Sequence, residues 1–170
     1  MLYLLDASLL ITANSSYYPV DSVPEYWDWL LHQASEGRVK VPREIFEEIT
    51  DGPNNKDVDL LYQWIRQDAV TKALLLDERV DAALIQEVLA RGYGPDLTDT
   101  DLETIGRDPF LIAYALAAPN DRAIATVEVS KPKRKRQNRK LPDVCAEFQI
   151  TSCTPFAMNR TLGFRTDWRK

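Results

Sequence analysis

The chain has 170 residues, of which 45% are hydrophobic and 28% are charged, and its formal net charge is −5. A chain of this length fits a single domain, residues 1–170, and it lacks an apolar run long enough to cross a bilayer. The acidic balance argues against general coating of nucleic acid, but it is compatible with a nuclease whose metal site is built from carboxylates.

The amino terminus and the cysteines indicate the compartment. The apolar run Leu2–Leu5 has neither the basic region nor the cleavage site of a secretory signal, so it is predicted to be a strand. Cys145 and Cys153 have no zinc-ligand spacing, and we interpret them as reduced, mostly buried thiols. These features predict a cytoplasmic protein that does not associate with membranes.

Short strands alternate with helices along the first half of the chain. The strand Leu2–Leu5 ends at Asp6, and small residues follow before the next apolar run. Apolar residues at helical spacing predict a helix over 23–34, which Gly37 ends. The other elements expected here are a short helix at 9–13, an extended piece at 38–41, a helix that begins at Pro42, and a break at 51–55.

The same alternation continues through the second half. The run 70–76 is too short for periodicity to decide between a strand and the start of a helix. The remaining expected elements are helices at 58–65, at 77–91 (ended by Gly92), at 98–105 (with a Thr100–Glu103 capping box), from Asp108 to about Pro119 and at 143–148, strands at 122–127 and 149–153, and a closing turn or helix at 154–162. This alternation predicts an α/β fold with a mainly parallel sheet covered on both faces.

Four carboxylates occupy informative positions. Asp6 ends the first strand, Asp108 begins a helix and Glu128 follows the strand at 122–127, whereas Glu48 lies within a helix. A parallel sheet gathers the residues that follow its strands at one edge, where ligands bind in open α/β sheets. Carboxylate oxygens are ligands that Mg²⁺ prefers, and one or two such ions could activate water for phosphodiester cleavage.

Each of these acids also has an ordinary structural interpretation. Asp108 precedes a proline, as helix caps often do, and Asp6 could cap the helix that follows it. Glu47 and Glu48 could lie on a solvated helix face, and Glu128 could be an exposed acid. The functional hypothesis therefore rests on the whole set of acids and on their order along the chain.

Other catalytic classes have little support in the sequence. His32 is the only histidine, and we interpret it as a packing or surface residue because nothing near it suggests a serine-type triad. The cysteines lack a nearby basic partner in the sequence, so a thiol nucleophile is not expected. No glycine-rich phosphate loop is present.

A basic run, KPKRKRQNRK at residues 131–140, lies in a segment (130–140) that is expected to be an exposed, mobile loop. Three interpretations are open. The loop could be solvated and without function, it could reach RNA phosphates beside the acidic site, or it could bind an acidic partner protein. The residues that would bind RNA or a partner are Lys133, Arg134, Lys135 and Arg136.

Five segments occur in an order that is similar to the motifs of a known family. In chain order they are YLLDASLLI, VPREIFEEI, DPFLIAYALA, IATVE and KLPDVCAEFQI. The set resembles the PIN-domain ribonucleases, and in particular the prokaryotic PIN-like branch related to toxins of toxin–antitoxin pairs. The positions that the resemblance selects are Asp6, Glu48 (with Glu47 as the alternate), Asp108, Thr126 and Glu128, with Asp143 as a further acid near the site.

The resemblance implies a three-layer α/β/α sandwich around a parallel sheet of four or five strands. It also implies a Mg²⁺- or Mn²⁺-dependent endoribonuclease that cleaves single-stranded RNA. Asp6, Glu48, Asp108 and Glu128 would be its catalytic and metal-binding acids, and Thr126 would order the site. A toxin of this kind would be inhibited by a cognate antitoxin protein, and members of the family commonly form homodimers.

Two other functions are open alternatives. One is a non-catalytic PIN-fold module that binds RNA or protein through the basic run, and such a module would keep binding after a change at Asp6. The other is a metal-dependent DNA nuclease or phosphatase built on the same sheet. A comparison of RNA, DNA and phosphomonoester hydrolysis would separate it from the ribonuclease.

Overall fold

Four strands form one sheet in the computed structural model, which describes residues 1–51 and 59–169. The strands lie in the order β2-β1-β3-β4, and every neighbouring pair is parallel. Their bounds are β1 (Leu2–Leu5), β2 (Val39–Lys40), β3 (Arg122–Ala125) and β4 (Thr151–Cys153). The predicted α/β class with a parallel sheet is therefore confirmed.

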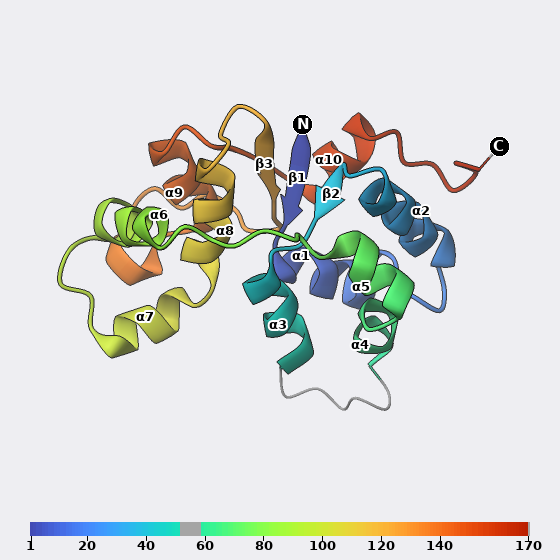
Figure 1. Ribbon diagram of the computed structural model, residues 1–170, viewed down its shortest axis with the longest axis horizontal. Coiled ribbons are helices and arrows are strands. Elements are labelled where there is room, and N and C mark those ends of the chain that lie inside the picture. The colour runs from blue at the N-terminus through green and yellow to red at the C-terminus, as the bar shows by residue number, and fades with distance from the viewer. Residues whose placement is uncertain (52–58, 170) are drawn as a thin grey trace.

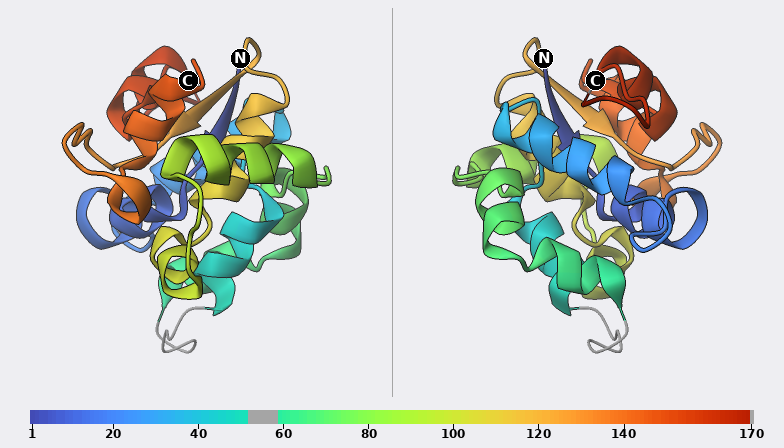
Figure 2. Two further views of the ribbon diagram at one scale, coloured as in Figure 1. Left: turned by 90° about the vertical axis from the view of Figure 1, so that its left-hand side faces the viewer. Right: turned by 90° about the vertical axis from the view of Figure 1, so that its right-hand side faces the viewer.

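The two central strands are apolar on both faces. Leu4 and Leu5 in β1 and Ile124 and Ala125 in β3 are all fully buried. Polar residues alternate with apolar ones in a strand when one face of the sheet is wet, whereas helices cover both faces here (Figures 1 and 2). This cover explains why the amino-terminal strand is a continuous apolar run.

Helices make up much of the rest of the described chain. Their bounds are α1 (Ala7–Thr12), α2 (Pro24–Ser35), α3 (Arg43–Asp51), α4 (Leu60–Ile65), α5 (Asp68–Leu74), α6 (Ala82–Glu87), α7 (Asp99–Ile105), α8 (Asp108–Leu116), α9 (Leu141–Glu147) and α10 (Pro155–Thr161). Wider π-type turns, η1 (Ala13–Tyr17) and η2 (Val88–Tyr93), continue α1 and α6, and η3 (Arg136–Asn138) is a short 3-10 turn. Helices α2, α4 and α5 lie on the β2 side of the molecule, and α6 to α9 lie on the β3 side (Figure 1). Within the described residues, no helix is long and apolar enough to cross a membrane.

Two ambiguous or misplaced segments are settled by the structure. The run 70–76 is mostly helical, because α5 continues to Leu74, and only then does Leu75 form a parallel bridge with Val41. The helix predicted at 77–91 begins later, at Ala82. Its start is fixed by Asp81, whose carboxylate accepts a hydrogen bond from the amide of Ala83 at 2.8 Å.

Helix ends account for the other differences. The capping box of α7 consists of Thr98 and Asp101, whose side chains exchange hydrogen bonds with each other's amides, and not of Thr100 and Glu103. Helix α9 begins two residues earlier than predicted, at Leu141. Apart from residue 51, the break predicted at 51–55 lies outside the described residues, as does residue 58 of the helix predicted at 58–65.

The sequence predicts that Gly92 ends a helix, and this prediction is wrong. The chain passes through Gly92 within η2 and turns only at Gly94, where φ is 115°. Glycine is needed at position 92 because this residue packs closely against Val144 of α9 and against Phe148, which directly follows α9. A Cβ atom there would lie 2.7 Å from Val144 Cγ1 and 3.2 Å from the ring of Phe148. Helix α9 therefore approaches η2 more closely than a larger residue would allow.

We expect Gly92→Ala to destabilise the protein by about 1–3 kcal/mol, the usual cost of forcing an extra carbon into a packed contact. Val144→Ala removes the obstructing methyl group, so the double variant should recover part of that loss. Urea denaturation of the wild type, both single variants and the double variant would measure the coupling. Strictly additive effects would contradict the proposed clash.

His32, interpreted from the sequence as a packing or surface residue, is exposed on α2. Its ring stacks on Trp168 with 5.0 Å between ring centroids. The indole of Trp168 also donates a hydrogen bond to the carbonyl of Glu25 at 3.1 Å. Both partners lie on α2, so these contacts fasten the carboxyl-terminal segment to that helix.

Candidate active site

The strand order creates a switch point between β1 and β3. The chain passes from β1 to β2 on one side of the sheet and then returns across β1 to β3 on the other. Ligands in open α/β sheets bind at the carboxyl ends of the strands where the order reverses in this way. Asp6 follows β1 and Thr126 follows β3, so both residues stand at this position.

The register of the sheet brings Asp6 against Thr126. Leu5 pairs with Ala125, and the amide of Asp6 donates to the carbonyl of Ala125 at 3.1 Å. Thr126 Oγ1 donates to Asp6 Oδ2 at 2.7 Å, and Ser8 Oγ donates to the same oxygen. Burial raises the pKa of Asp6, while the two hydroxyl donors oppose that rise. These donors fix the orientation of a buried carboxylate.

Two helices bring further acids to Asp6. Glu48 lies on α3, and Asp108 is the first residue of α8. Burial, followed by the charges of Asp6, Glu128 and Glu48, raises the pKa of Asp108 to about 8. The side chain of Glu48 is exposed, but partial desolvation and then the charge of Asp6 still raise its pKa, with Arg107 opposing the rise. The charges of Asp6, Glu128 and Glu48 thus all act on Asp108, and the charge of Asp6 acts on Glu48.

The helix-cap interpretation does not account for Asp108. The N-cap position of α8 is Arg107, and the start of this helix has no side-chain cap. Asp6 does occupy the N-cap position of α1, but its carboxylate accepts its hydrogen bonds from two hydroxyl groups. The bond from Thr126 therefore ties Asp6 to the end of β3, a contact that a role at the start of α1 alone would not require.

Glu128 differs from the other acids because protein donors occupy both of its carboxylate oxygens. Lys140 Nζ lies 2.6 Å from Oε1, and the amide of Leu141 donates to Oε2 at 2.9 Å. The amide of Glu128 donates in turn to Thr126 Oγ1 at 3.0 Å. Glu128 therefore joins the end of β3 to the start of α9, and Lys140 partly neutralises its charge.

The acids suit a hard divalent cation that keeps part of its water shell. Across residues 1–51 and 59–169, no three carboxylate, histidine or cysteine side chains are arranged to hold one ion directly. Mg²⁺ commonly uses one or two carboxylates and retains several waters. Asp6 and Asp108 are the candidates for direct contact, because burial, and after it neighbouring carboxylates, raise the pKa of each and a cation would offset that cost, and Glu48 would then act through water.

Two of the remaining predicted residues, Asp143 and Arg136, hold the basic segment in place. Asp143 anchors the basic segment, since it accepts hydrogen bonds from Ser130 Oγ and from the amide of Lys131 at 2.7 Å. Glu47 is half-buried on α3, beside Glu48 in sequence. The guanidinium of Arg136 donates to the carbonyl of Asp96 at 3.0 Å.

The exposure predicted for residues 130–140 is confirmed for 130–136 and 138, whereas Gln137, Arg139 and Lys140 are half-buried. The side chains of Lys133, Arg134 and Lys135 form no ion pair within the described part of the chain. The four basic residues predicted to bind RNA or a partner thus divide into three exposed residues without an ion pair and one, Arg136, that is already held by protein groups.

Comparison with known proteins gives one match. A family model described as "Domain of unknown function (DUF4411)" matches residues 3–166. The chain belongs to this family. Neither the curated proteins nor the solved structures contain a match to it.

The site of this DUF4411 chain contains residues that sequence reasoning missed. Ser8 could have been suspected, because a hydroxyl two residues after a strand-ending aspartate can reach back to it. Tyr93 gave no such signal, yet its hydroxyl is buried without a hydrogen-bond partner among the described residues, and the nearby charge of Asp108 helps burial to raise its pKa. Cys145 lies close by, and burial followed by the charge of Asp108 raises its pKa to about 12, which leaves the thiol protonated.

Proposed function

We propose that this chain is a metal-dependent nuclease that cleaves single-stranded RNA. One observation carries the proposal: Asp6, Glu48 and Asp108, which are far apart in the sequence, converge at the switch point of a parallel sheet. The charges that act on these acids are mainly those of other acids, and Arg107 at Glu48 and Lys140 at Asp108 oppose them only in part. An acidic pocket whose charge is only partly compensated favours a bound cation.

The architecture is compatible with a PIN-like domain, and the proposed function does not depend on that assignment. The sheet is parallel, its order is compatible with such a domain, and the motifs around Asp6, Glu48, Asp108 and Thr126 resemble those of PIN-domain ribonucleases in their order. The cognate antitoxin and the homodimer stay predictions of that resemblance.

In the proposed reaction, Asp6 and Asp108 would hold a Mg²⁺ or Mn²⁺ ion, with Glu48 acting through water. Such an ion stabilises negative charge on phosphoryl oxygens and activates water when it is bound. The protein contributes the orientation of Asp6, which Ser8 and Thr126 fix by hydrogen bonds. It also contributes the burial of Asp6 and the half-burial of Asp108, which strengthen their interaction with a cation.

The function is tested by incubating the purified chain with single-stranded RNA, single-stranded DNA and a phosphomonoester, each with Mn²⁺ and with EDTA. We expect cleavage of RNA that requires the ion and little action on the other two substrates. Equal cleavage of DNA would favour the DNA nuclease, and hydrolysis of the monoester alone would favour the phosphatase. Absence of any metal-stimulated hydrolysis across varied RNAs would refute the proposal.

Metal binding can be measured without any activity. At a Mn²⁺ concentration of 100 times its Kd, binding should stabilise the folded chain by about 2.7 kcal/mol, which corresponds to a rise of roughly 5–10 °C in Tm for a chain of this size. Asp99→Asn changes an exposed acid in the first turn of α7 and should keep the whole effect. A Tm that does not respond to Mn²⁺ in the wild type would contradict the metal site.

A further inference from the structure

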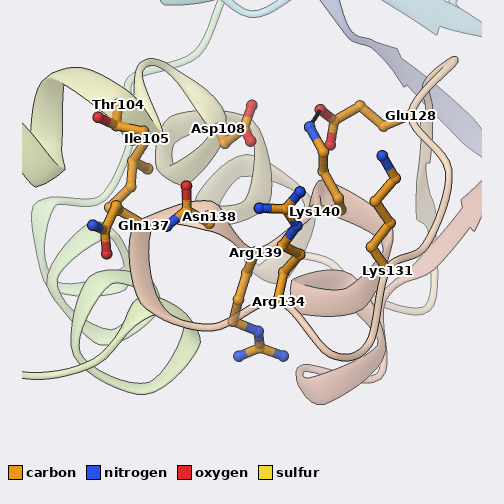
Figure 3. Close-up of a pocket in the computed structure, with 10 residues that line it drawn as sticks. All are labelled: Thr104, Ile105, Asp108, Glu128, Lys131, Arg134, Gln137, Asn138, Arg139 and Lys140. Atoms are coloured by element: carbon orange, nitrogen blue, oxygen red, sulfur yellow. Dashed lines mark hydrogen bonds and ion pairs between the residues drawn. The ribbon is translucent and has the colours of Figure 1, made fainter.

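A polar pocket of about 370 Å³ joins the acidic site to the basic segment. Its lining includes the acids Asp108 and Glu128 and the basic residues Lys131, Arg134, Arg139 and Lys140. Figure 3 shows the side chain of Lys140 reaching Glu128, with that of Lys131 extending beside it from the loop. The volume is within the range of ordinary ligand sites. Anionic and cationic groups thus face the same space.

The loop that supplies the cations is fastened at three points. Asp143 holds its beginning through Ser130 and the amide of Lys131. The guanidinium of Arg136 holds its middle to the carbonyls of residues 95 and 96 and lies 3.7 Å from Asp101. Arg139 holds its end, where it contacts the carbonyl of residue 92, the carbonyl of Asp143 and the carboxylate of Glu147. A loop fixed in this way loses little conformational entropy when it binds a ligand.

The same contacts divide the basic residues into two classes. Arg136, Arg139 and Lys140 have protein acceptors, so their charges are already partly compensated. Lys131 and Arg134 line the pocket, and in the described residues their side chains form no ion pair. Their two positive charges therefore face the pocket without a protein partner.

We propose that Lys131 and Arg134 bind a backbone phosphate of the RNA strand next to the acids at the switch point. This inference rests on the proposed function, because it names the part of the protein that holds the substrate of that reaction. A phosphate entering an acidic site needs cations that the site itself does not neutralise, and these two side chains supply them. The amide side chains of Gln137 and Asn138 also line the pocket and can donate hydrogen bonds to the same strand.

The structure offers a matched control within the same loop. Lys131→Ala/Arg134→Ala removes two charges from the pocket, and Lys133→Ala/Lys135→Ala removes two exposed charges that do not line it. Binding of a fluorescent single-stranded RNA, measured by anisotropy in EDTA so that no cleavage occurs, should weaken about 10-fold or more in the first variant and about twofold or less in the second. The slope of log Kd against log salt should fall by about 0.7 for each phosphate contact that is lost.

Equal weakening in the two variants would overturn the inference, because it would show diffuse attraction to the whole basic run. Unchanged binding in both would overturn it as well, and so would displacement of the RNA by a polyglutamate of matched charge. The two proposals fail separately. If Lys131→Ala/Arg134→Ala leaves RNA binding unchanged while the wild type still cleaves RNA, only the proposed phosphate site is refuted. If that variant weakens RNA binding but the wild type shows no metal-stimulated cleavage, only the proposed nuclease activity is refuted.

Discussion

Asp108→Asn is expected to lower metal-stimulated RNA cleavage by more than about 100-fold. This loss is larger than the usual cost of losing a residue that only supports a metal ligand. The same change is expected to make the metal-free protein more stable. The activity falls because the amide lacks the charge that a divalent cation requires. The stability rises because Asp108 is half-buried among other acids, whose repulsion an uncharged side chain does not feel.

The pH dependence of this stability follows from the raised pKa of Asp108. Burial, then the charges of Asp6, Glu128 and Glu48, shift that pKa from 3.8 to about 8 in the folded protein. Between these values the folded chain retains a proton that the unfolded chain has lost, so this group makes the protein less stable as the pH rises toward 8 and has no further effect above it. Asparagine has no such proton.

The Tm of Asp108→Asn should therefore exceed that of the wild type by a margin that grows from pH 5 to pH 8 and is then constant. At pH 8 we expect the margin to be at least roughly 2–4 °C, which corresponds to about 1 kcal/mol for a chain of this size. Thermal melts in EDTA measure it, with Asp99→Asn as the exposed control. A margin that is equal at pH 5 and pH 9 would show that Asp108 is not in this environment.

Thr126→Val is expected to reduce cleavage by about 10–100-fold, the usual cost of losing a group that orients a metal ligand. Valine has a similar shape, but it cannot donate to Asp6 Oδ2 or accept from the amide of Glu128. Because Thr126 is buried, the unpaired groups should also lower the free energy of unfolding by about 1–3 kcal/mol.

Thr126→Ser keeps the hydroxyl and should retain most of the cleavage activity. A kinetic comparison of the two variants at saturating Mn²⁺ separates the hydroxyl from the shape of the side chain. If valine and serine lowered kcat by the same factor, the hydroxyl would have no part in orienting Asp6.

The placement of Asp6 and Thr126 at one edge of the sheet could be predicted from the sequence because it depends on local signals. Apolar runs that stop at Asp6 and Thr126 mark the ends of two strands, and parallel strands place such ends at one edge. The start of α8 at Asp108 was equally clear from the proline that follows. The strand order could not be predicted from the sequence, and this order is what makes β1 and β3 neighbours.

Packing and long-range polar contacts could not be predicted in this way. Gly92 looked like a helix stop because glycine usually has that role, whereas the close approach of Val144 is a property of the folded chain. Asp143 looked like a member of the acidic site, yet its partners are a hydroxyl and an amide of the basic loop. Arg136 looked free because its acceptors lie about forty positions earlier in the sequence.

The hydrogen bond between Thr126 and Asp6 joins residues 120 positions apart in the chain. During translation, the first strand therefore leaves the ribosome long before its partner β3 has been made. A nascent or truncated chain that stops before residue 122 has Asp6 and Glu48 but not the neighbour that orients them. The proposed nuclease would therefore not attack RNA, including its own messenger, until synthesis has passed Thr126 and β3 can pair with β1.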